Sequence, residues 1–313
     1  MKFEEAIQTF DTIVENGPLG TRLKYDYGYE ASFDLTERKE GRIALTELYE
    51  GDIAVAQEHH LPIILNAATF RTNRNHLQAA GFKSDGDLKR INTNCINFIK
   101  AIRTRHADSS FPIFIGAPLG SMYDAYSVDV IPSIEEAQRY HEEQINIFKE
   151  LEVDFVNVVT LPSLAEAIGI SLAAERARIN YTIGFILNKD GMLLDGASLE
   201  EAIQTIDART TRKPLGYLIT CTHSSIIEKL TKSPDKYNRL IGAQPNGSSL
   251  SPKELAAMDR PLTDSPEKFT KELMRLKTTL GLKIVGGCCG TTRAHLQCIA
   301  QSCAPFPTLR CRM

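Results

Sequence analysis

The stretch DFVNVVTLPSLAEAIGISLAAERA, residues 154–177, joins a short apolar run to a longer helical pattern. The run Asp154–Val159 is nearly continuously apolar and rich in β-branched residues, as expected for a parallel strand covered on both faces. The segment Ser163–Ala177 then shows the apolar spacing that is typical of an α-helix. We interpret this stretch as one strand–helix unit.

The same unit recurs along the whole chain. Apolar runs predict strands over Thr12–Glu15, Pro62–Asn66, Pro112–Gly116, Asp154–Val159, Thr182–Leu187, Leu215–Thr220, Arg239–Ala243 and Lys283–Gly287. Helical patterns between them cover Arg42–His59, Asp87–Thr104, Ile134–Leu151, Ser163–Ala177 and Pro266–Leu280. Ser133 and Ser198 each precede a glutamate by three residues, which is the spacing of a capping box. Eight such units predict an α/β fold, a single (β/α)8 TIM barrel over residues 1–313, with a doubly wound sheet as the alternative.

The composition excludes several classes of protein. Of the 313 residues, 42% are hydrophobic and 24% are charged, which is typical of a globular protein. The net charge of −3 and the lack of a dense Lys/Arg run argue against nucleic-acid binding. No apolar stretch approaches the length of a membrane span, and the acidic N-terminus has no apolar signal core. We therefore expect a cytoplasmic protein, and its oligomeric state is not predicted.

Three of the seven cysteines follow predicted strands. Cys221 ends the sixth strand in LGYLITCTHSS, and Cys288 and Cys289 end the eighth in KIVGGCCGTT. A barrel brings all strand C-termini to one rim, where three thiolates suit Zn²⁺ and leave a fourth position open, as in catalytic zinc sites. Flanking glycines would permit the sharp bend that adjacent cysteines need in order to share an ion. From spacing alone, a strained turn or a vicinal redox pair that forms a Cys288–Cys289 disulfide on oxidation remains an equal alternative. The other cysteines, Cys95, Cys298, Cys303 and Cys311, are interpreted as packing residues.

Several segments resemble the homocysteine S-methyltransferase family. GGCCGTTRAHL is similar to its C-terminal signature, and further similar segments are NGPLGTRL, LNAATFRTN, GAPLGSMYDAY, FILNKDGMLLDGASLEEAI and AQPNGSS. The resemblance implies a (β/α)8 barrel with zinc bound by Cys221, Cys288 and Cys289. It also implies methyl transfer from a small donor to a zinc-activated thiol, with homocysteine as the family's acceptor and methionine as its product. No catalytic residue beyond the zinc ligands is implied.

The departures from the family pattern concern the acceptor. The candidate substrate residues are Asn16, Thr69, Val159 and Thr220. In the family, carboxylates at the positions of Asn16 and Val159 help to hold the substrate amino group, whereas here one is a neutral amide and the other a hydrocarbon. Thr220 stands where the family has asparagine. We therefore expect homocysteine to be a poor acceptor.

The sequence leaves two alternative functions open, and it also raises the questions of the methyl donor and of the role of His223. The chain could be a methyltransferase for a thiol without an amino-acid head, or a non-catalytic relative that binds zinc or a ligand. The donor is a small molecule such as S-methylmethionine, S-adenosylmethionine or betaine. Because no cobalamin-like or folate-like module is present, a methylcobalamin or methyl-folate donor would need a separate corrinoid or other protein to deliver it.

His223, two residues after Cys221, is interpreted as a solvated or hydrogen-bonding residue, with a role as fourth ligand or base as the alternative.

Overall fold

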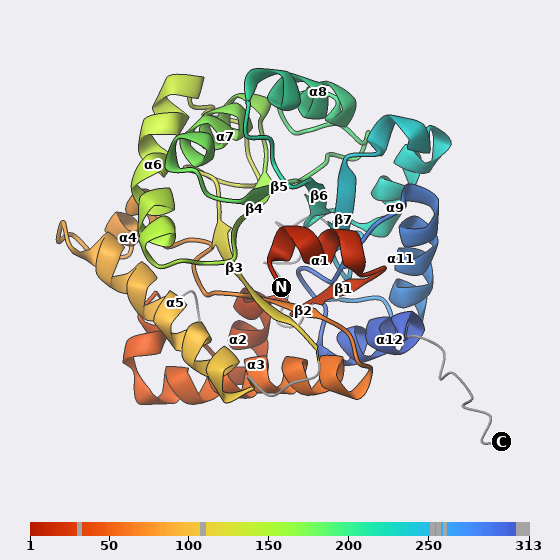
Figure 1. Ribbon diagram of the computed structural model, residues 1–313, viewed down its shortest axis with the longest axis horizontal. Helices are drawn as coiled ribbons and strands as arrows, with labels where there is room; N and C mark the ends of the chain where they lie inside the picture. The colour runs from red at the N-terminus through yellow and green to blue at the C-terminus, as the bar shows by residue number, and fades with distance from the viewer. Residues whose placement is uncertain (30–32, 107–110, 251–253, 255–257, 259–261, 305–313) are drawn as a thin grey trace.

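The strands form a closed parallel barrel in the computed structural model, which describes residues 1–29, 33–106, 111–250, 254, 258 and 262–304 (Figure 1). In barrel order the strands are β1 (Ile13–Glu15), β2 (Ile63–Asn66), β3 (Ile113–Leu119), β4 (Phe155–Leu161), β5 (Tyr181–Phe185), β6 (Tyr217–Thr220), β7 (Leu240–Gln244) and β8 (Ile284–Val285). The pairing of β8 with β1 closes the barrel, with Ile284 opposite Ile13. The predicted (β/α)8 barrel is confirmed, and the doubly wound sheet is excluded.

Helices surround this barrel (Figure 1). They are α1 (Phe3–Thr9), α2 (Leu19–Tyr27), η1 (Leu35–Glu37), α3 (Lys39–Glu58), α4 (Arg74–Ala79), α5 (Asp87–Arg105), α6 (Ile134–Glu150), α7 (Leu164–Ala177), α8 (Leu199–Arg209), α9 (Ser224–Ile227), η2 (Glu228–Lys232), η3 (Pro234–Tyr237), α11 (Pro266–Leu280) and α12 (Arg293–Cys303). Ser133 and Ser198 cap α6 and α8 by accepting the backbone N–H of Glu136 and Glu201, as their spacing predicted. None of the helices in the described part of the chain is long and apolar enough to cross a membrane.

The inside of the barrel is apolar at one end. Side chains from alternate strand positions meet there because successive residues of a strand face opposite sides. The buried residues of this layer are Ile13, Ile64, Phe114, Phe155, Leu218 and Ile284. Helix α1 lies across this end (Figure 1), and its Phe3 stacks on Phe155 at a centroid distance of 4.0 Å. The N-terminal end of the barrel is thereby filled with side chains, and a ligand is expected to bind at the opposite, C-terminal rim.

Two residues further along the strands, the interior becomes polar. Glu15 of β1 accepts the side-chain N–H groups of Asn66 and Asn157, the latter at 2.8 Å. Thr182 of β5 donates to Asn157 at 2.9 Å. A polar layer in a barrel core loses hydration on folding, and it is tolerated here because these groups satisfy one another. It forms the floor beneath the C-terminal rim.

Several strand ends differ from the prediction by two or three residues. Strand β3 continues to Leu119 instead of Gly116, and β5 ends at Phe185 instead of Leu187.

Strand β4 continues to Leu161 instead of ending at Val159, with a register shift between Val158 and Leu161. Thr160 within this irregular stretch adopts φ +60°, which is a strained conformation for a β-branched residue. The eighth strand ends at Val285, before the predicted Gly287. All four deviations occur at the rim that carries the cysteines.

Candidate active site

Cys221, Cys288 and Cys289 converge at the C-terminal rim. Their sulfurs all lie within 4.8 Å of one another, although Cys221 is separated from the pair by 67 residues in sequence. In this structure Cys221 and Cys288 form a disulfide, with Cα atoms 5.4 Å apart, and Cys289 is a free thiol. The sulfur bonded to Cys288 is thus that of Cys221 at the end of β6, and not that of its neighbour Cys289. The predicted convergence of the three cysteines is observed.

A tight turn after β8 presents the two adjacent cysteines. The N–H groups of Cys288 and Thr291 donate to the carbonyls of Pro245 and Cys288, at 2.7 and 3.0 Å. Gly290 adopts φ +84°, and a Cβ atom at Gly287 would clash with the Thr291 side chain. Glycine is therefore required at both positions, for the backbone angle and for the close approach respectively.

Cys221 is held by the neighbouring strand. It is buried and adopts φ +51°, outside the strand conformation. Its N–H donates to the carbonyl of Gln244 at 3.1 Å, and its own carbonyl accepts the Asn246 side chain at 2.9 Å. Strained residues of this kind persist where the surrounding contacts fix them, and they cluster at functional sites.

The loop after β3 brings a hydroxyl to the sulfurs. Tyr126 Oη donates to Cys221 Sγ at 3.7 Å, and burial raises the pKa of Tyr126. Buried Glu166 anchors this loop by accepting Ser121 Oγ at 2.7 Å and the Met122 N–H at 2.6 Å. Sequence reasoning missed Tyr126, although the GAPLGSMYDAY segment that ends on it was part of the resemblance. Tyr126 follows β3, three strands from β6 in the barrel, and no sequence pattern indicates its contact with Cys221.

A pocket of about 460 Å³ opens next to the three sulfurs. Its wall is mostly aromatic and apolar, with Tyr25, Tyr29, Phe33, Phe70 and Tyr126 among the lining residues. Burial raises the pKa of the Cys289 thiol, while the Tyr126 hydroxyl and the positive charge of Arg71 oppose this shift. A mostly apolar cavity that ends on reactive sulfurs can exclude water around a small substrate.

Two of the four predicted substrate residues line this pocket. Asn16 and Val159 do so, whereas Thr69 and Thr220 are fully buried and outside the lining. The Thr69 hydroxyl donates to the Pro118 carbonyl at 2.8 Å, and Thr220 Oγ1 accepts the Thr160 N–H at 2.8 Å. Both threonines therefore support the backbone below the pocket, and the structure does not bring them to its surface.

Glu15 is a buried acid at the end of β1, directly before Asn16. The structure turns it into the barrel, in the polar layer beneath Asn66 and Gln244, which themselves line the pocket. It is 1% exposed, and burial raises its pKa against the opposing effect of the amide hydrogen bonds. Its Oε2 has no hydrogen-bond partner of ordinary geometry. A carboxyl in this position favours its neutral form.

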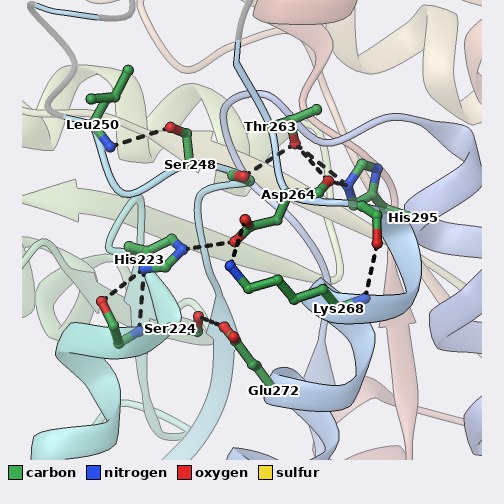
Figure 2. Close-up of polar contacts among 12 residues, drawn as sticks. His223, Ser224, Ser248, Leu250, Thr263, Asp264, Lys268, Glu272 and His295 are labelled. Carbon is green, nitrogen blue, oxygen red and sulfur yellow. Dashed lines mark hydrogen bonds and ion pairs between the residues drawn. The ribbon is translucent and has the colours of Figure 1, made fainter.

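His223 belongs to a separate polar group, shown in Figure 2. Its Nδ1 bonds with Ser225 Oγ at 2.8 Å, and its Nε2 with Asp264 Oδ2 at 3.2 Å. Lys268 donates to the other oxygen of Asp264 at 2.8 Å, and Glu272 accepts the Ser224 hydroxyl. Both ring nitrogens are therefore engaged away from the cysteines, which supports the hydrogen-bonding role predicted for His223. His223, Asp264 and Glu272 also have the spacing of metal ligands, but Lys268 already supplies the positive charge.

Known proteins resemble this chain in sequence and in fold. A family model described as homocysteine S-methyltransferase matches residues 56–303. The homocysteine methyltransferase MmuM from Escherichia coli is 15% identical, and its metallated form gives a TM-score of 0.77 over 95% of this chain and 98% of that one. The oxidized form of MmuM gives a TM-score of 0.74 over 95% of this chain and 97% of that one. At this identity the structural likeness establishes the fold. None of the curated proteins matches. The matched residues begin after Asn16, so the departure at that position lies outside the family match.

Proposed function

Because this chain belongs to the homocysteine S-methyltransferase family, and is thus a thiol S-methyltransferase, we propose that Cys221, Cys288 and Cys289 hold a zinc ion that activates the acceptor thiol. The observation that carries the proposal is the convergence of three sulfurs within 4.8 Å at the end of a pocket. Tetrahedral zinc with bonds of about 2.3 Å needs sulfurs about 3.8 Å apart. The reduced cysteines therefore fit this ion with small side-chain rotations. The metallated form of MmuM supports a metal in this fold.

A zinc ion held here would favour the thiolate form of an incoming thiol. The protein's own residues then have to orient the two substrates. The rigid turn at Gly287 and Gly290 fixes the two adjacent ligands, and the hydrogen bonds to Cys221 fix the third. The aromatic wall can exclude water from the reacting atoms, and the transfer requires it to hold the donor's methyl group in line with the sulfur. The thiolate electron pair forms the new S–C bond, and the donor leaves with the electrons of the bond that breaks.

The acceptor and the cellular setting follow from the same site. Homocysteine is the family's acceptor, and its methylation would give methionine. The alternative is a thiol without an amino group, which the neutral Asn16 and Val159 favour. Three reduced cysteines require a reducing compartment, which supports a cytoplasmic location. The donor is a small molecule, delivered directly or by a separate protein.

A donor and thiol screen tests the proposal. The zinc-loaded, reduced protein is incubated with S-methylmethionine, S-adenosylmethionine or betaine and with a set of small thiols, and the thioether product is identified by mass spectrometry. We expect one donor to methylate at least one thiol, and the C221A variant to form no product. If zinc-loaded protein forms no thioether from any pair, the methyl-transfer proposal fails and the non-catalytic zinc-binding alternative takes its place.

A further inference from the structure

The pocket beside the cysteines has an unbalanced charge. Among its lining residues, all of which lie in the described part of the chain, there is no aspartate or glutamate. Two cationic residues do line it, Arg71 after β2 and Lys24 on α2. Apart from the cysteine sulfurs, the charged side chains of the pocket wall are therefore both positive, which disfavours an ammonium group beside them and favours an anion.

The groups that could offset this charge are engaged elsewhere. Asn16 Nδ2 donates to the Gly17 carbonyl at 3.2 Å, and its Oδ1 accepts the Asn66 N–H at 2.8 Å. One lone pair of its amide oxygen is thus already in use, and Asn16 is 4% exposed. Glu15 is buried behind the pocket floor, outside the pocket lining, where Asn66 and Asn157 donate to its Oε1 and its Oε2 has no partner of ordinary geometry. Neither residue presents a carboxylate to a substrate ammonium at the pocket surface.

Both cations lie beside aromatic rings of the pocket lining, and both residues are exposed. The Arg71 guanidinium lies 5.8 Å from the Phe70 ring centroid, and Lys24 Nζ lies 5.3 Å from that of Tyr25. Both rings line the pocket. Neither cation takes part in an ion pair among the described residues. Arginine presents a planar fork that matches a carboxylate or sulfonate, which makes Arg71 the stronger anion-binding group.

We propose that the acceptor is an acidic thiol, a small thiol with a carboxylate or similar anion, and that Arg71 binds this anion. The inference rests on the proposed function and deepens it by naming the substrate class. An amino group on the acceptor contributes no binding, because the pocket wall offers it two cations and no acid. Homocysteine has the anion but also carries the disfavoured ammonium.

Cobalt-substituted protein measures thiol binding without a methyl donor. Co²⁺ replaces zinc, and the sulfur-to-cobalt charge-transfer bands report both the three-cysteine site and the arrival of a fourth thiol. Four thiols with the same carbon chain to the sulfur separate the two charges. They are 1-propanethiol, 4-mercaptobutanoate, 3-aminopropane-1-thiol and homocysteine.

We expect 4-mercaptobutanoate to bind about tenfold more tightly than propanethiol. The difference is modest because a charge-assisted hydrogen bond to an exposed cation contributes less binding free energy than one to a buried cation. Aminopropanethiol should bind more weakly than propanethiol, and homocysteine more weakly than 4-mercaptobutanoate. The Arg71→Gln variant should lose the tenfold preference and bind propanethiol as before. Arg139→Gln, which removes an exposed cation of α6 outside the pocket, serves as the charge-matched control.

The two possible failures are distinct. If cobalt shows no thiolate bands, the three-cysteine site and with it the proposed function are wrong. If the bands appear but homocysteine or the aminothiol binds most tightly, or Arg71→Gln leaves the order unchanged, the acidic-thiol inference is overturned while the methyl-transfer proposal stands.

Discussion

The two sides of the pocket differ in how closely they follow the family. The side built from β6 and β8 carries Cys221, Cys288 and Cys289, the set that the resemblance implies. The side built from β1 and β4 carries Asn16 and Val159, where the resemblance implies carboxylates in the family. In our proposal, the first side activates the sulfur and the second recognises the remainder of the acceptor. The difference supports the proposal that the methyl-transfer chemistry is retained while the acceptor differs.

Removing a cysteine from the β8 turn should have the largest effect. In Cys288→Ala the remaining two sulfurs cannot hold zinc at neutral pH, so metal content should fall from about one ion per chain to near zero, and activity should disappear. Metal analysis after dialysis measures this. Cys303→Ala, which alters a half-buried cysteine at the end of α12, should retain its zinc. Full zinc occupancy in Cys288→Ala would refute the three-thiolate site.

The metal side was predictable because it depends on chain topology. Residues that follow parallel strands of one barrel meet at one rim, whatever fills the rest of the sequence. The strands and the helix Pro266–Leu280 were likewise predicted from periodicity, with errors at strand ends such as β4. The error at β4 arose where the register shift and the positive φ of Thr160 interrupt the strand, and neither feature has a sequence pattern.

The acceptor side was only partly predictable. Sequence alone identified the neutral residues at 16 and 159, but not that Thr69 and Thr220 face structural partners. The sequence analysis also did not assign a side to Glu15, which follows the alternation of β1 and faces the barrel interior two residues after Ile13. Contacts such as that of Tyr126 with Cys221 depend on loop paths, which local sequence does not specify.

Restoring acid on the β1–β4 side should reverse the acceptor preference. With Asn16→Asp plus Val159→Glu, kcat/KM for homocysteine relative to 4-mercaptobutanoate should rise about 30-fold, because a carboxylate forms charge-assisted bonds to an ammonium. The control is the single variant Val159→Gln, which keeps Asn16. It adds a polar side chain of the same shape as glutamate but without charge, and it should leave the ratio of kcat/KM values unchanged. Efficient homocysteine turnover by the wild type, unmatched by other thiols, would show that the two sides follow the family equally.

Tyr126, in the loop after β3, contacts the cysteine side, and its hydroxyl should have a smaller effect. In Tyr126→Phe the hydrogen bond to Cys221 Sγ is lost, so zinc should transfer to a chelator about tenfold faster, as for other partners of metal ligands. Tyr123→Phe provides the control in the same loop, since its hydroxyl bonds to Glu136 instead. Equal release rates for the two variants would assign Tyr126 to pocket shape alone.

Glu15 should produce the smallest effect, on stability and not on metal binding. Burial raises the pKa of this carboxyl, so the folded protein binds its proton more tightly than the unfolded chain does. The resulting stabilisation is complete at pH values below the pKa that Glu15 has in the unfolded chain. It is lost as the pH rises through the pKa that Glu15 has in the folded protein. Glu15→Gln removes this loss, because a glutamine oxygen can still accept from Asn66 and Asn157.

The free energy of unfolding of the variant should therefore increase relative to that of the wild type as the pH rises from 4 to 8, by about 1 kcal/mol. Urea unfolding of the metal-free proteins at each pH measures the difference, and zinc content should be the same in both. Glu135→Gln, on the exposed first turn of α6, should show no such trend. A stability difference that shrinks with rising pH would mean that Glu15 is ionised and stabilising, and the pocket would then contain a negative floor. In that case the contrast between its two sides would be weaker than the neutral Asn16 and Val159 imply.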